Sequence, residues 1–595
     1  MRIKYIDGNR FSRAIAAGAK RIFDRQHYLN KINVFPVPDA DTGTNMASTL
    51  KSIVESISNI RSPKIYSLSK TVADSALLGA RGNSGVILAQ YFYGISEELK
   101  KEIRVTTEKF GEVVKNAVHY AYEALTQPKE GTILTVIKDW AESVYEQRFA
   151  KTDFVELLNH ALESAKKSLK ETTNKLEILK SSKVVDAGGQ GFVDLLEGIK
   201  NYISKGKIKD LVFSKTPKIE TAVHTEISPE DIKYQYCTEC LIEGENININ
   251  ELRKKINDFG DSIVIAGSPQ KARLHIHTNR PADVFSIARH SGSLLQQKAD
   301  DMFKQYQVSH KKHPSIALVT DSACDLPQRI IDKYDIHIVP VRVSFGHSTY
   351  IDKITITPEY FYEMLKNEPV HPTTSQPPPS DFKNLYGFLL SHYDSIISIH
   401  LTAASSGTYQ NAVNAAKSFP DRKITVIDGK SLSVTLGFVV QEAARLISEG
   451  KNHDEVVSQT IEARPRTQLF VNIPSLKYLM KSGRVSKAKG LLANLLHLKP
   501  ILNLDENGVP QHCNKSFSYN GSLKKVFKLV KEFVRDKKNL RFIVAHATAP
   551  EAAQYYVDKL RGDFGVLDIP ILPVSPTLGA HAGPGTAAIG ITWNN

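Results

Sequence analysis

The hydrophobic pattern changes along this chain, and that change constrains the fold more than any other feature. In the first ~200 residues, apolar side chains recur at i, i+3 and i+4, as in 110–121 and 158–169, which is typical of amphipathic helices. From Ser315 onward, short apolar runs alternate with helical stretches. We therefore predict a multidomain chain with an all-α helical bundle first and an α/β region last.

The second half contains several apolar runs that predict strands: 316–320, 336–343, 395–400, 424–427 and 541–546. Polar residues follow these runs, as in Thr320-Asp-Ser322 and Ser406-Gly-Thr-Tyr409. Loops at the carboxyl ends of strands are where α/β folds bind ligands. We expect a ligand site at these loops.

A chain of 595 residues is too long for one hydrophobic core, and its length suggests about three to five domains. We predict a helical domain at 1–204, a Lys-, Thr- and Glu-rich linker at 205–232, a small α/β middle domain at 233–310, and the α/β region at 315–595. In the middle domain we expect strands near 234–243, 262–267 and 272–278 around a helix at 250–258.

The net charge of +14 would suit nucleic acid, an anionic membrane surface or anionic substrates. Solvated lysines spread over several domains would give the same total. No Lys/Arg-rich run with interleaved aromatic residues stands out, so we expect no nucleic-acid partner. The start lacks an apolar signal core and no apolar run approaches ~18 residues, which predicts a cytoplasmic protein, peripheral at the inner membrane face. Four cysteines in this length suit reduced thiols.

One stretch near the start, Asn33-Val-Phe-Pro-Val-Pro-Asp-Ala-Asp-Thr-Gly-Thr-Asn-Met46, carries two aspartates on an extended loop. Pro36 and Pro38 exclude a helix there, so a helix is expected to begin at about Thr42. Carboxylates on such a loop suit Mg²⁺ together with substrate phosphates. A surface turn with solvated aspartates is the alternative.

Two glycine-rich segments precede apolar helices expected at 86–93 and 192–199. They are Leu78-Gly-Ala-Arg-Gly-Asn-Ser-Gly85 and Val185-Asp-Ala-Gly-Gly-Gln-Gly191. Glycines at a helix start let backbone N–H groups approach a phosphate or a base. Either segment alone is a weak signal, and a tight helix–helix turn is the more common reason for such a pattern.

Together with Glu130-Gly-Thr-Ile-Leu-Thr-Val136, these strings resemble, in order, the loops around Mg-ATP in the dihydroxyacetone kinase family, in the DhaL-like form found in bacterial fatty acid kinases. The resemblance implies that Asp39 and Asp41 hold Mg²⁺. It also implies that ATP is bound by Thr42, Gly43, Thr44, Asn45, Asn83, Ser84, Gly85, Thr132, Asp186, Gly188 and Gly189. The chain departs from the family at Ala40, where glycine is usual, and Val34 stands where dihydroxyacetone kinases proper carry a third acidic ligand.

The middle domain contains Tyr236-Cys-Thr-Glu-Cys240 and Leu274-His-Ile-His-Thr278. His275 and His277 alternate along one strand, so both side chains face the same way. With a cysteine from a second strand they would form a Cys-His-His site for Zn²⁺ with one open position. The alternative is two solvent-facing histidines and two buried thiols. The middle domain of fatty acid kinases has a similar arrangement, which supports Cys237 as a ligand but not Cys240.

Residues 315–595 resemble the DegV family, the fatty-acid-binding subunits of bacterial fatty acid kinase. The motifs are Val319-Thr-Asp-Ser, Thr374-Ser-Gln-Pro, Ser406-Gly-Thr-Tyr, Ser482-Gly-Arg-Val, Leu498-Lys-Pro-Ile-Leu and His581-Ala-Gly-Pro-Gly585. The resemblance implies a carboxylate site at the mouth of an apolar tunnel. Its residues would be Thr374, Ser406 or Ser405, His581 and Gly583.

Hydroxyl donors at a helix N-terminus stabilise a carboxylate and leave one oxygen to attack phosphorus. Arg484 is expected either to assist catalysis near the phosphoryl group or to be an ordinary surface arginine. For His581 the alternative is a loop histidine with an ordinary structural hydrogen bond.

These resemblances imply an enzyme: a fused fatty acid kinase that phosphorylates a bound long-chain fatty acid with Mg-ATP, forming an acyl phosphate for phospholipid synthesis. We expect a homodimer and, as a partner, an acyltransferase that uses acyl phosphate. The alternatives are a lipid-binding or regulatory protein whose nucleotide domain senses ATP, and a dihydroxyacetone-type kinase. Whether transfer runs within one chain or between two stays open.

Overall fold

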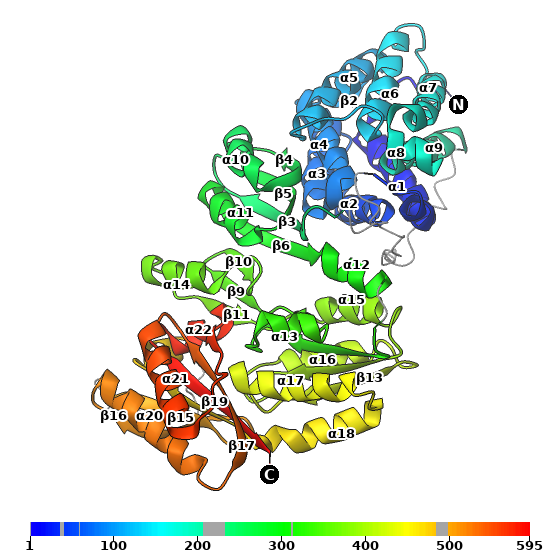
Figure 1. The fold of residues 1–595 in the computed structure, drawn as a ribbon. Helices are drawn as coiled ribbons and strands as arrows, with labels where there is room; N and C mark the ends of the chain where they lie inside the picture. Colours follow the sequence, from blue (N-terminus) through cyan, green and yellow to red (C-terminus); the bar gives the residue numbers. More distant parts are fainter. Residues whose placement is uncertain are drawn as a thin grey trace. The chain divides into compact units, whose positions relative to one another are not determined.

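The computed structural model describes residues 2–35, 41–58, 60–205, 232–310, 313–483 and 498–594. Asp39, Ala40, Arg484 and nearly all of the predicted linker at 205–232 lie outside these ranges. The contacts divide the chain into two compact units, Met1–His310 and Lys311–Asn595. The predicted multidomain architecture is confirmed, since a helical region is followed by a small sheet and then by an α/β region (Figure 1).

The first unit begins with helices, coloured blue to cyan in Figure 1. They are α1 (Gly8–Lys31), α2 (Thr42–Ile57), α3 (Ile65–Gly79), α4 (Gly82–Glu98), α5 (Thr107–Glu123), α6 (Ile133–Gln147), α7 (Phe154–Lys175), α8 (Glu177–Ser182) and α9 (Ala187–Lys205). Two short strands, β1 (Ile6–Asp7) and β2 (Arg104–Val105), pair antiparallel beside them. The helices predicted from periodicity at 110–121 and 158–169 are confirmed as α5 and α7. Side-chain caps start both, because Thr106 accepts from the N–H of Lys109 and Asp153 from that of Val155.

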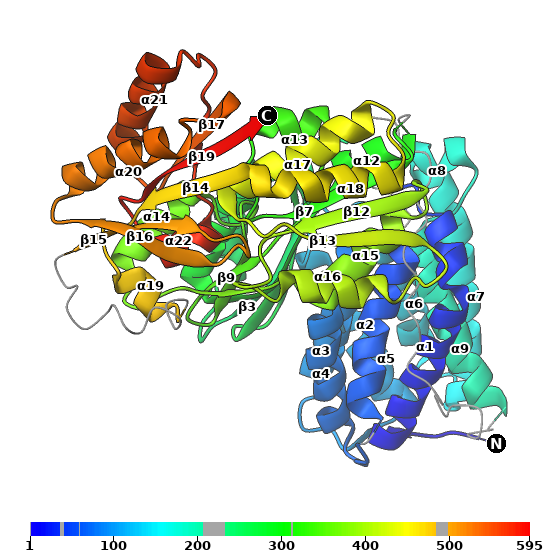
Figure 2. The same ribbon diagram turned by 90° about the horizontal axis from the view of Figure 1, so that it is seen from below.

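The helices pack their apolar faces into one core. Ile22, Leu50, Val113, Leu134 and Ala161 come from five different helices, and each has no exposed surface. Helix α1 lies along α9 and α2 along α3, as Figure 2 shows from below. Burying a large aliphatic side chain in this core stabilises the folded state by about 1.5–3 kcal/mol. The shared core therefore holds the loops that connect the helices in place.

The middle of the chain forms an antiparallel sheet in the order β4-β5-β3-β6. Its elements are β3 (Tyr236–Glu243), α10 (Ile249–Ile256), β4 (Gly260–Gly267), β5 (Lys271–Thr278), α11 (Pro281–Ala288), β6 (Ser293–Asp301) and α12 (Met302–His310). The three predicted strands and the first helix are confirmed; α11, β6 and α12 were not predicted. The sheet packs on the helical bundle within the first unit, since β4 contacts α4 and the N–H of Ile265 donates to the carbonyl of Ala124 at 2.9 Å.

The second unit is α/β. Its helices are α13 (Gln328–Lys333), α14 (Pro358–Asn367), α15 (Pro379–Leu389), α16 (Thr408–Ala416), α17 (Ser433–Ser448), α18 (His453–Ala463), α19 (Lys477–Lys481), α20 (Tyr519–Phe533), α21 (Pro550–Phe564) and α22 (Pro576–Ala582). Its strands are β7 (Ile316–Asp321), β8 (His337–Val339), β9 (Arg342–Phe345), β10 (Ser348–Ile351), β11 (Thr373–Ser375), β12 (Ser395–His400), β13 (Lys423–Asp428), β14 (Thr467–Asn472), β15 (Lys499–Leu504), β16 (Pro510–Ser516), β17 (Lys538–His546), β18 (Ile571–Pro573) and β19 (Ala587–Asn594).

These strands form a parallel sheet in the order β13-β12-β7-β8, a mixed sheet in the order β16-β15-β14-β19-β17-β18, and a small antiparallel sheet in the order β10-β9-β11. The apolar run at 336–343 was predicted as one strand, but the structure divides it between β8 and β9, which belong to different sheets. Pro340 stands at the break and has no N–H to donate to a ladder. The turn carries the chain from the parallel sheet to the small sheet that holds β11.

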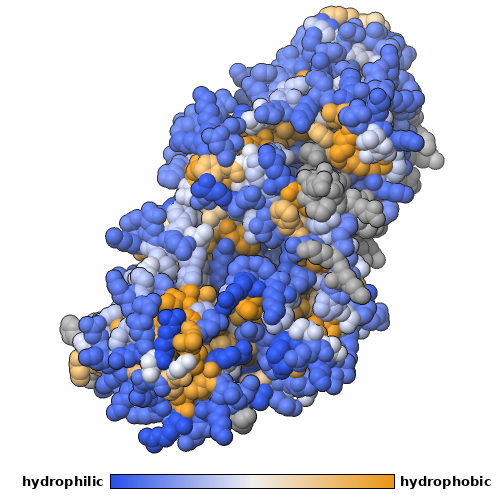
Figure 3. All heavy atoms as spheres, viewed as in Figure 1, coloured by the Kyte–Doolittle hydropathy of each residue, from blue (hydrophilic) through white to orange (hydrophobic). Residues whose placement is uncertain are grey.

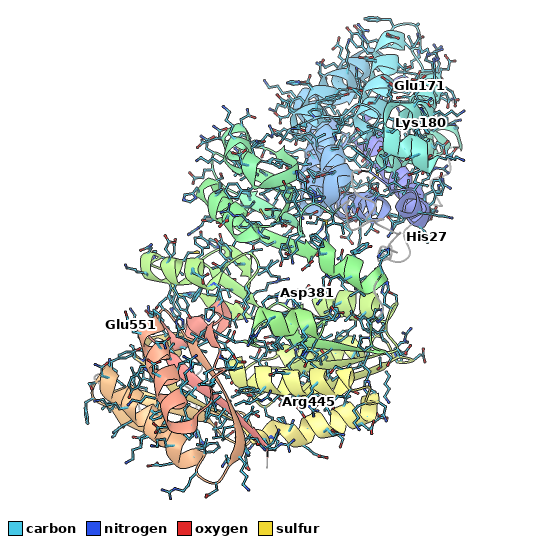
Figure 4. The ribbon with its side chains drawn as sticks, in the orientation of Figure 1. His27, Glu171, Lys180, Asp381, Arg445 and Glu551 are labelled. Atoms are coloured by element: carbon cyan, nitrogen blue, oxygen red, sulfur yellow. The ribbon has the colours of Figure 1, made fainter. Side chains whose placement is uncertain are left out.

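The visible surface is mostly hydrophilic, with apolar residues gathered in several places (Figure 3). Charged pairs at the surface also position elements of the second unit. Asp381, labelled in Figure 4, accepts from Arg342 Nη2 at 2.6 Å and joins the start of α15 to β9. Among the residues that the structure describes, no helix combines the length and the apolar character needed to cross a bilayer.

Candidate functional site

Helix α2 begins at Thr42, as predicted, directly after the aspartate loop. Asp41 is its N-cap residue, yet its side chain makes no capping hydrogen bond. Thr44 is held from α1, because its hydroxyl accepts from Gln26 Nε2 at 3.1 Å and from Asn30 Nδ2 at 3.0 Å. The first turn of α2 is therefore fixed against α1. The Asp41 carboxylate does not cap the N–H groups of that turn.

The second predicted loop packs directly on this turn. Gly82 has φ +53°, and a Cβ built on it would lie 2.1 Å from Asn45 Nδ2, so glycine is required by both conformation and space. A Cβ built on Gly85 would lie 2.6 Å from Thr49 Oγ1 and 3.2 Å from the carbonyl oxygen of Asn45. Asn83 has a buried side-chain oxygen with no hydrogen-bond partner. The segments 41–45 and 82–85 therefore form one continuous surface.

The third and fourth predicted loops meet the second one. A Cβ on Gly188 would lie 2.8 Å from Ser84 Oγ and 3.2 Å from the Cβ of Ile133, the first residue of α6. Thr132 is the N-cap residue of α6, and its hydroxyl donates to the carbonyl of Lys129 at 2.8 Å. All four segments that the sequence singled out for the nucleotide thus come together at the starts of α2, α4, α6 and α9.

Asp186 turns inward at the start of α9. Its carboxylate accepts from the N–H of Gly189 at 2.7 Å, and the side chain is buried. Burial raises the pKa of Asp186 to about 6, although hydrogen bonds from the backbone N–H groups of Gly189 and Ile133 oppose the rise. Its observed contacts stabilise the loop itself.

Cys237, His275 and His277 form a cluster in the middle domain. Cys237 and His277 are directly opposite each other on β3 and β5, and His275 is two residues along the same face. One ligand atom from each residue lies within 4.8 Å of the others. His275 is buried and its Nε2 has no hydrogen-bond partner. One thiol and two imidazoles, one of which has a buried nitrogen without a hydrogen-bond partner, fit a Zn²⁺ site with three protein ligands.

Cys240 lies apart from this cluster. It pairs with Leu274, so it belongs to the opposite face of the sheet, where it is fully buried. Burial raises its pKa to about 12, which keeps the thiol protonated.

Glu239 joins the metal cluster to the glycine loop of the helical bundle. It is 1% exposed, and its carboxylate accepts from the N–H of Gly82 at 2.8 Å. The same carboxylate contacts His275 Nδ1 at 3.3 Å and accepts from Arg273 Nη2 at 3.1 Å. Burial opposes ionisation, but the bond with His275 and the charges of Lys298 and Arg273 hold the pKa of Glu239 well below its usual range. The carboxylate is therefore ionised.

Burial and neighbouring negative charges keep the Cys237 thiol protonated. Burial raises the pKa of the Cys237 thiol well above its usual value, and the charges of Glu239, Asp300 and Asp41 raise it further. Lys298 acts in the opposite direction.

A separate polar site lies in the second unit. Thr374 on β11 and His581 on α22 meet, with Oγ1 and Nε2 3.0 Å apart. Asp352 is fully buried and accepts from the N–H of Thr577 at 3.3 Å and from Ser322 Oγ at 2.6 Å. Since Thr577 is in the first turn of α22, this carboxylate helps to hold the helix that carries His581.

The loop with Ser405 and Ser406 lies beside the segment that follows β11. Ser406 Oγ accepts from the N–H of Thr408 at 3.2 Å, so it belongs to the start of α16. A Cβ on Gly407 would lie 2.7 Å from the Gln376 amide, two residues beyond Thr374. Gly583 has φ +78°, and a Cβ there would lie 2.2 Å from the ring of Tyr478. The predicted lipid-site residues in the described part of the chain thus gather around β11 and the end of α22.

Three sequence models match successive parts of the chain. The DAK2 domain matches residues 36–201, the middle domain of fatty acid kinase-like proteins matches 233–309, and "Uncharacterised protein, DegV family" matches 315–593. These three matches identify the domains of the chain. The chain joins a DAK2 domain, a fatty acid kinase-like middle domain and a DegV domain.

Curated relatives match about half of the chain. An uncharacterized protein of Staphylococcus epidermidis is 37% identical over 317 residues, which cover 51% of this chain and 57% of that protein. An uncharacterized protein of Staphylococcus saprophyticus is 36% identical over 324 residues, covering 52% of this chain and 58% of that protein. The chain thus spans somewhat over half the length of these relatives.

Two solved structures resemble the DegV part. A fatty-acid-binding DegV-family protein from Thermus thermophilus is 28% identical, covers 47% of this chain and 100% of that chain, and has a TM-score of 0.45. DegV from Bacillus subtilis, described as a fatty acid binding protein, has the same identity, coverage and TM-score.

Several residues at these sites were missed from the sequence. In the middle domain, Glu239 is part of the Tyr-Cys-Thr-Glu motif and shares a strand face with Cys237, so its period-two spacing was the available signal. Arg273 has the same spacing from His275 and is completely buried. In the DegV domain, Asp352 and Tyr478 belong to no motif that was recognised, and only the tertiary contacts reveal them.

Proposed function

We propose that this protein phosphorylates the carboxyl group of a long-chain fatty acid, with ATP as phosphoryl donor. The observation that carries the proposal is the succession, in one chain, of a DAK2 domain, a fatty acid kinase-like middle domain and a DegV domain. The convergence of the four glycine-containing segments at helix starts supports nucleotide binding, because free N–H groups at helix N-termini favour phosphate.

In the reaction, a carboxylate oxygen attacks the γ-phosphorus, the new O–P bond forms, and the bond to the β-phosphate oxygen breaks to release ADP. Such transfer depends on positioning and charge neutralisation more than on covalent catalysis. Asp39 and Asp41 would hold Mg²⁺, which supplies charge neutralisation at the phosphates. Cys237, His275 and His277 would hold Zn²⁺.

The chain's own residues divide the work between the two units. Asn45, Asn83 and Ser84 bind and orient the phosphates, while Glu239 and Arg273 keep the glycine loop in place. In the DegV domain, Thr374 donates its hydroxyl proton to the fatty acid carboxylate and His581 Nε2 orients that hydroxyl. Ser405 or Ser406 supplies a further hydroxyl. Arg484 is proposed to contact the transferred phosphoryl group.

Fusion of the two activities in one chain raises the effective concentration of acceptor at the nucleotide site. The positive net charge suits an anionic membrane surface from which fatty acid is taken up. The acyl phosphate would then pass to an acyltransferase for phospholipid synthesis. We propose that the active form is a homodimer.

The test is incubation of the purified protein with Mg-ATP and oleate, followed by hydroxylamine, which converts an acyl phosphate to a hydroxamate. Hydroxamate that requires both ATP and fatty acid supports the proposal. Its absence, with fatty acid still bound to the protein, would contradict it and favour a lipid-binding regulator that senses ATP. ATP consumption dependent on dihydroxyacetone would favour the ketone kinase instead.

A further inference from the structure

The start of α4 is in contact with a buried charge network of the middle domain. The N–H of Gly82 donates to Glu239 Oε1 at 2.8 Å, across 157 positions of sequence. Arg81 Nη1 lies 3.5 Å from the other oxygen of the same carboxylate. An acidic side chain at a helix N-terminus is favourable, because it accepts a hydrogen bond that the helix leaves unmade.

The same carboxylate orients one residue of the Cys-His-His cluster. Glu239 Oε1 lies 3.3 Å from His275 Nδ1, and His275 Nε2 is buried without a partner. A histidine that ligates a metal through one ring nitrogen usually donates its other N–H to a carboxylate, which fixes the tautomer and the ring. Glu239 and His275 have this geometry, with Nε2 left for the metal.

Arg273 holds the Glu239 carboxylate in place. Both side chains are at most 1% exposed, and Arg273 Nη2 donates to Glu239 Oε2 at 3.1 Å. Arg273 Nη1 donates to Gln296 Oε1 at 3.0 Å. Gln296 has φ +48°, where the register between β3 and β6 shifts. The bulge thus places Gln296, in a strained backbone conformation, where its side chain accepts from Arg273. We infer that the fold holds the Arg273 side chain in this position.

The network therefore connects the two predicted ligand sites. On one side is the metal cluster; on the other are Gly82 and the side chain packed against it, Asn45, which belongs to the predicted phosphate loop. We propose that Glu239 couples zinc binding in the middle domain to nucleotide binding in the DAK2 domain. Zinc on His275 restrains the ring, the ring and Arg273 restrain the carboxylate, and the carboxylate holds the Arg81–Gly82 turn ready for phosphate.

This inference rests on the proposed kinase function and specifies its regulation. Coupling between two binding sites is reciprocal, so zinc should tighten nucleotide binding and nucleotide should tighten zinc binding by the same factor. Couplings of this kind typically amount to about 5–150-fold. Because zinc preorganises the loop, we expect saturating zinc to raise the affinity for the nucleotide by more than about 5-fold.

The experiment uses the full chain, stripped of metal with a chelator, and Mg-ADP as a probe that cannot be turned over. Calorimetry gives the ADP affinity without zinc and with saturating zinc, and competition with a zinc indicator gives the zinc affinity. Glu239→Gln keeps the shape and can still accept from Gly82, but it replaces one carboxylate oxygen by a donor facing Arg273. We expect zinc affinity to fall about 10–100-fold in this variant, and the zinc effect on ADP to fall to about one.

Glu243→Gln is the matched control, since Glu243 lies on the same strand and pairs with Lys271 at 2.9 Å at the surface. It should keep the wild-type coupling. If Glu239→Gln does not fold, Gln296→Ala removes only the second acceptor of Arg273 and should reduce the coupling partially.

The outcomes separate this inference from the proposed function. Failure of ADP to bind at all would overturn both the kinase and the coupling. ADP binding that zinc does not change in the wild-type chain, or a zinc effect that survives unchanged in Glu239→Gln, would overturn the coupling alone and leave the kinase standing. Failure of zinc to bind would overturn the coupling and the metal site, but not the kinase.

Discussion

Thr374 and His581 are 207 positions apart in the sequence, yet the hydroxyl of one lies 3.0 Å from Nε2 of the other. The pair is formed where the short strand β11 reaches helix α22. In the tautomer that carries its proton on Nε2, His581 donates to the Thr374 hydroxyl oxygen, and the hydroxyl keeps its own proton for an incoming carboxylate. This relationship makes the proposed carboxylate site of the DegV domain open to direct tests.

Replacing Thr374 by valine should weaken fatty acid binding about 10-fold or more, because a hydrogen bond to a charged group contributes about 1.5–3 kcal/mol. Valine keeps the shape of the side chain, so the fold should not change. Displacement of a fluorescent fatty acid measures the affinity. Thr373→Val is the control, because Thr373 is the exposed neighbour on the same strand. Equal affinities for the two variants would remove Thr374 from the site.

Replacing Asp41 by alanine should lower hydroxamate formation at least about 100-fold, since it removes charge stabilisation of the phosphates through Mg²⁺. Fatty acid binding should stay at the wild-type level, because the proposed lipid site belongs to the other unit. Asp24→Ala removes an exposed carboxylate of α1 and should change neither property. Loss of fatty acid binding in Asp41→Ala would contradict two separate sites.

Replacing Cys237 by alanine should remove the bound metal, because a site with three protein ligands then keeps only two. Mass spectrometry of metals in the purified chain should show close to one zinc ion per wild-type chain and almost none in the variant. Cys513→Ser tests a half-buried thiol in the other unit and should keep the metal. Full zinc content in Cys237→Ala would rule out the cluster.

Asp352 should make the stability of the second unit pH-dependent. Burial raises its pKa from 3.8 to about 6, and the charge of Lys353 only partly offsets this. Between these two values the folded state binds the proton and the unfolded state does not, so stability falls as the pH rises from about 4 to 6. The loss reaches about 3 kcal/mol at pH 7, at 1.36 kcal/mol per pKa unit.

Asp352→Asn should remove that loss. The free energy of unfolding of the variant should therefore rise relative to that of the wild-type protein as the pH increases, and the difference should persist at pH 7. Urea unfolding measures it through Trp593 in a Trp140→Phe background, because the sequence has two tryptophans. Asp568→Asn, at an exposed ion pair, is the control and should show no such pH dependence. A constant difference between pH 4 and pH 7 would refute the assignment.

Secondary structure was predictable where its cause is local. The i, i+3, i+4 spacing in 110–121 identified α5, and Pro36 and Pro38 indicated that a helix begins near Thr42. Strand β6 was missed because Ser293–Asp301 is polar and mostly half-buried at the edge of its sheet, which weakens its alternation. The split at Pro340 was missed because the apolar run continues through it.

The sequence by itself determined the residue types at the candidate sites and the order of the domains, because motifs and periodicity are local properties of the chain. Only the tertiary structure decided which of those residues meet. Glu239 reaches Gly82 because the sheet that contains β3 packs against α4 through β4 and β5, and Thr374 reaches His581 because β11 lies next to α22. Such contacts join residues more than 150 positions apart and depend on how the buried surfaces of whole elements fit together, which no local pattern encodes.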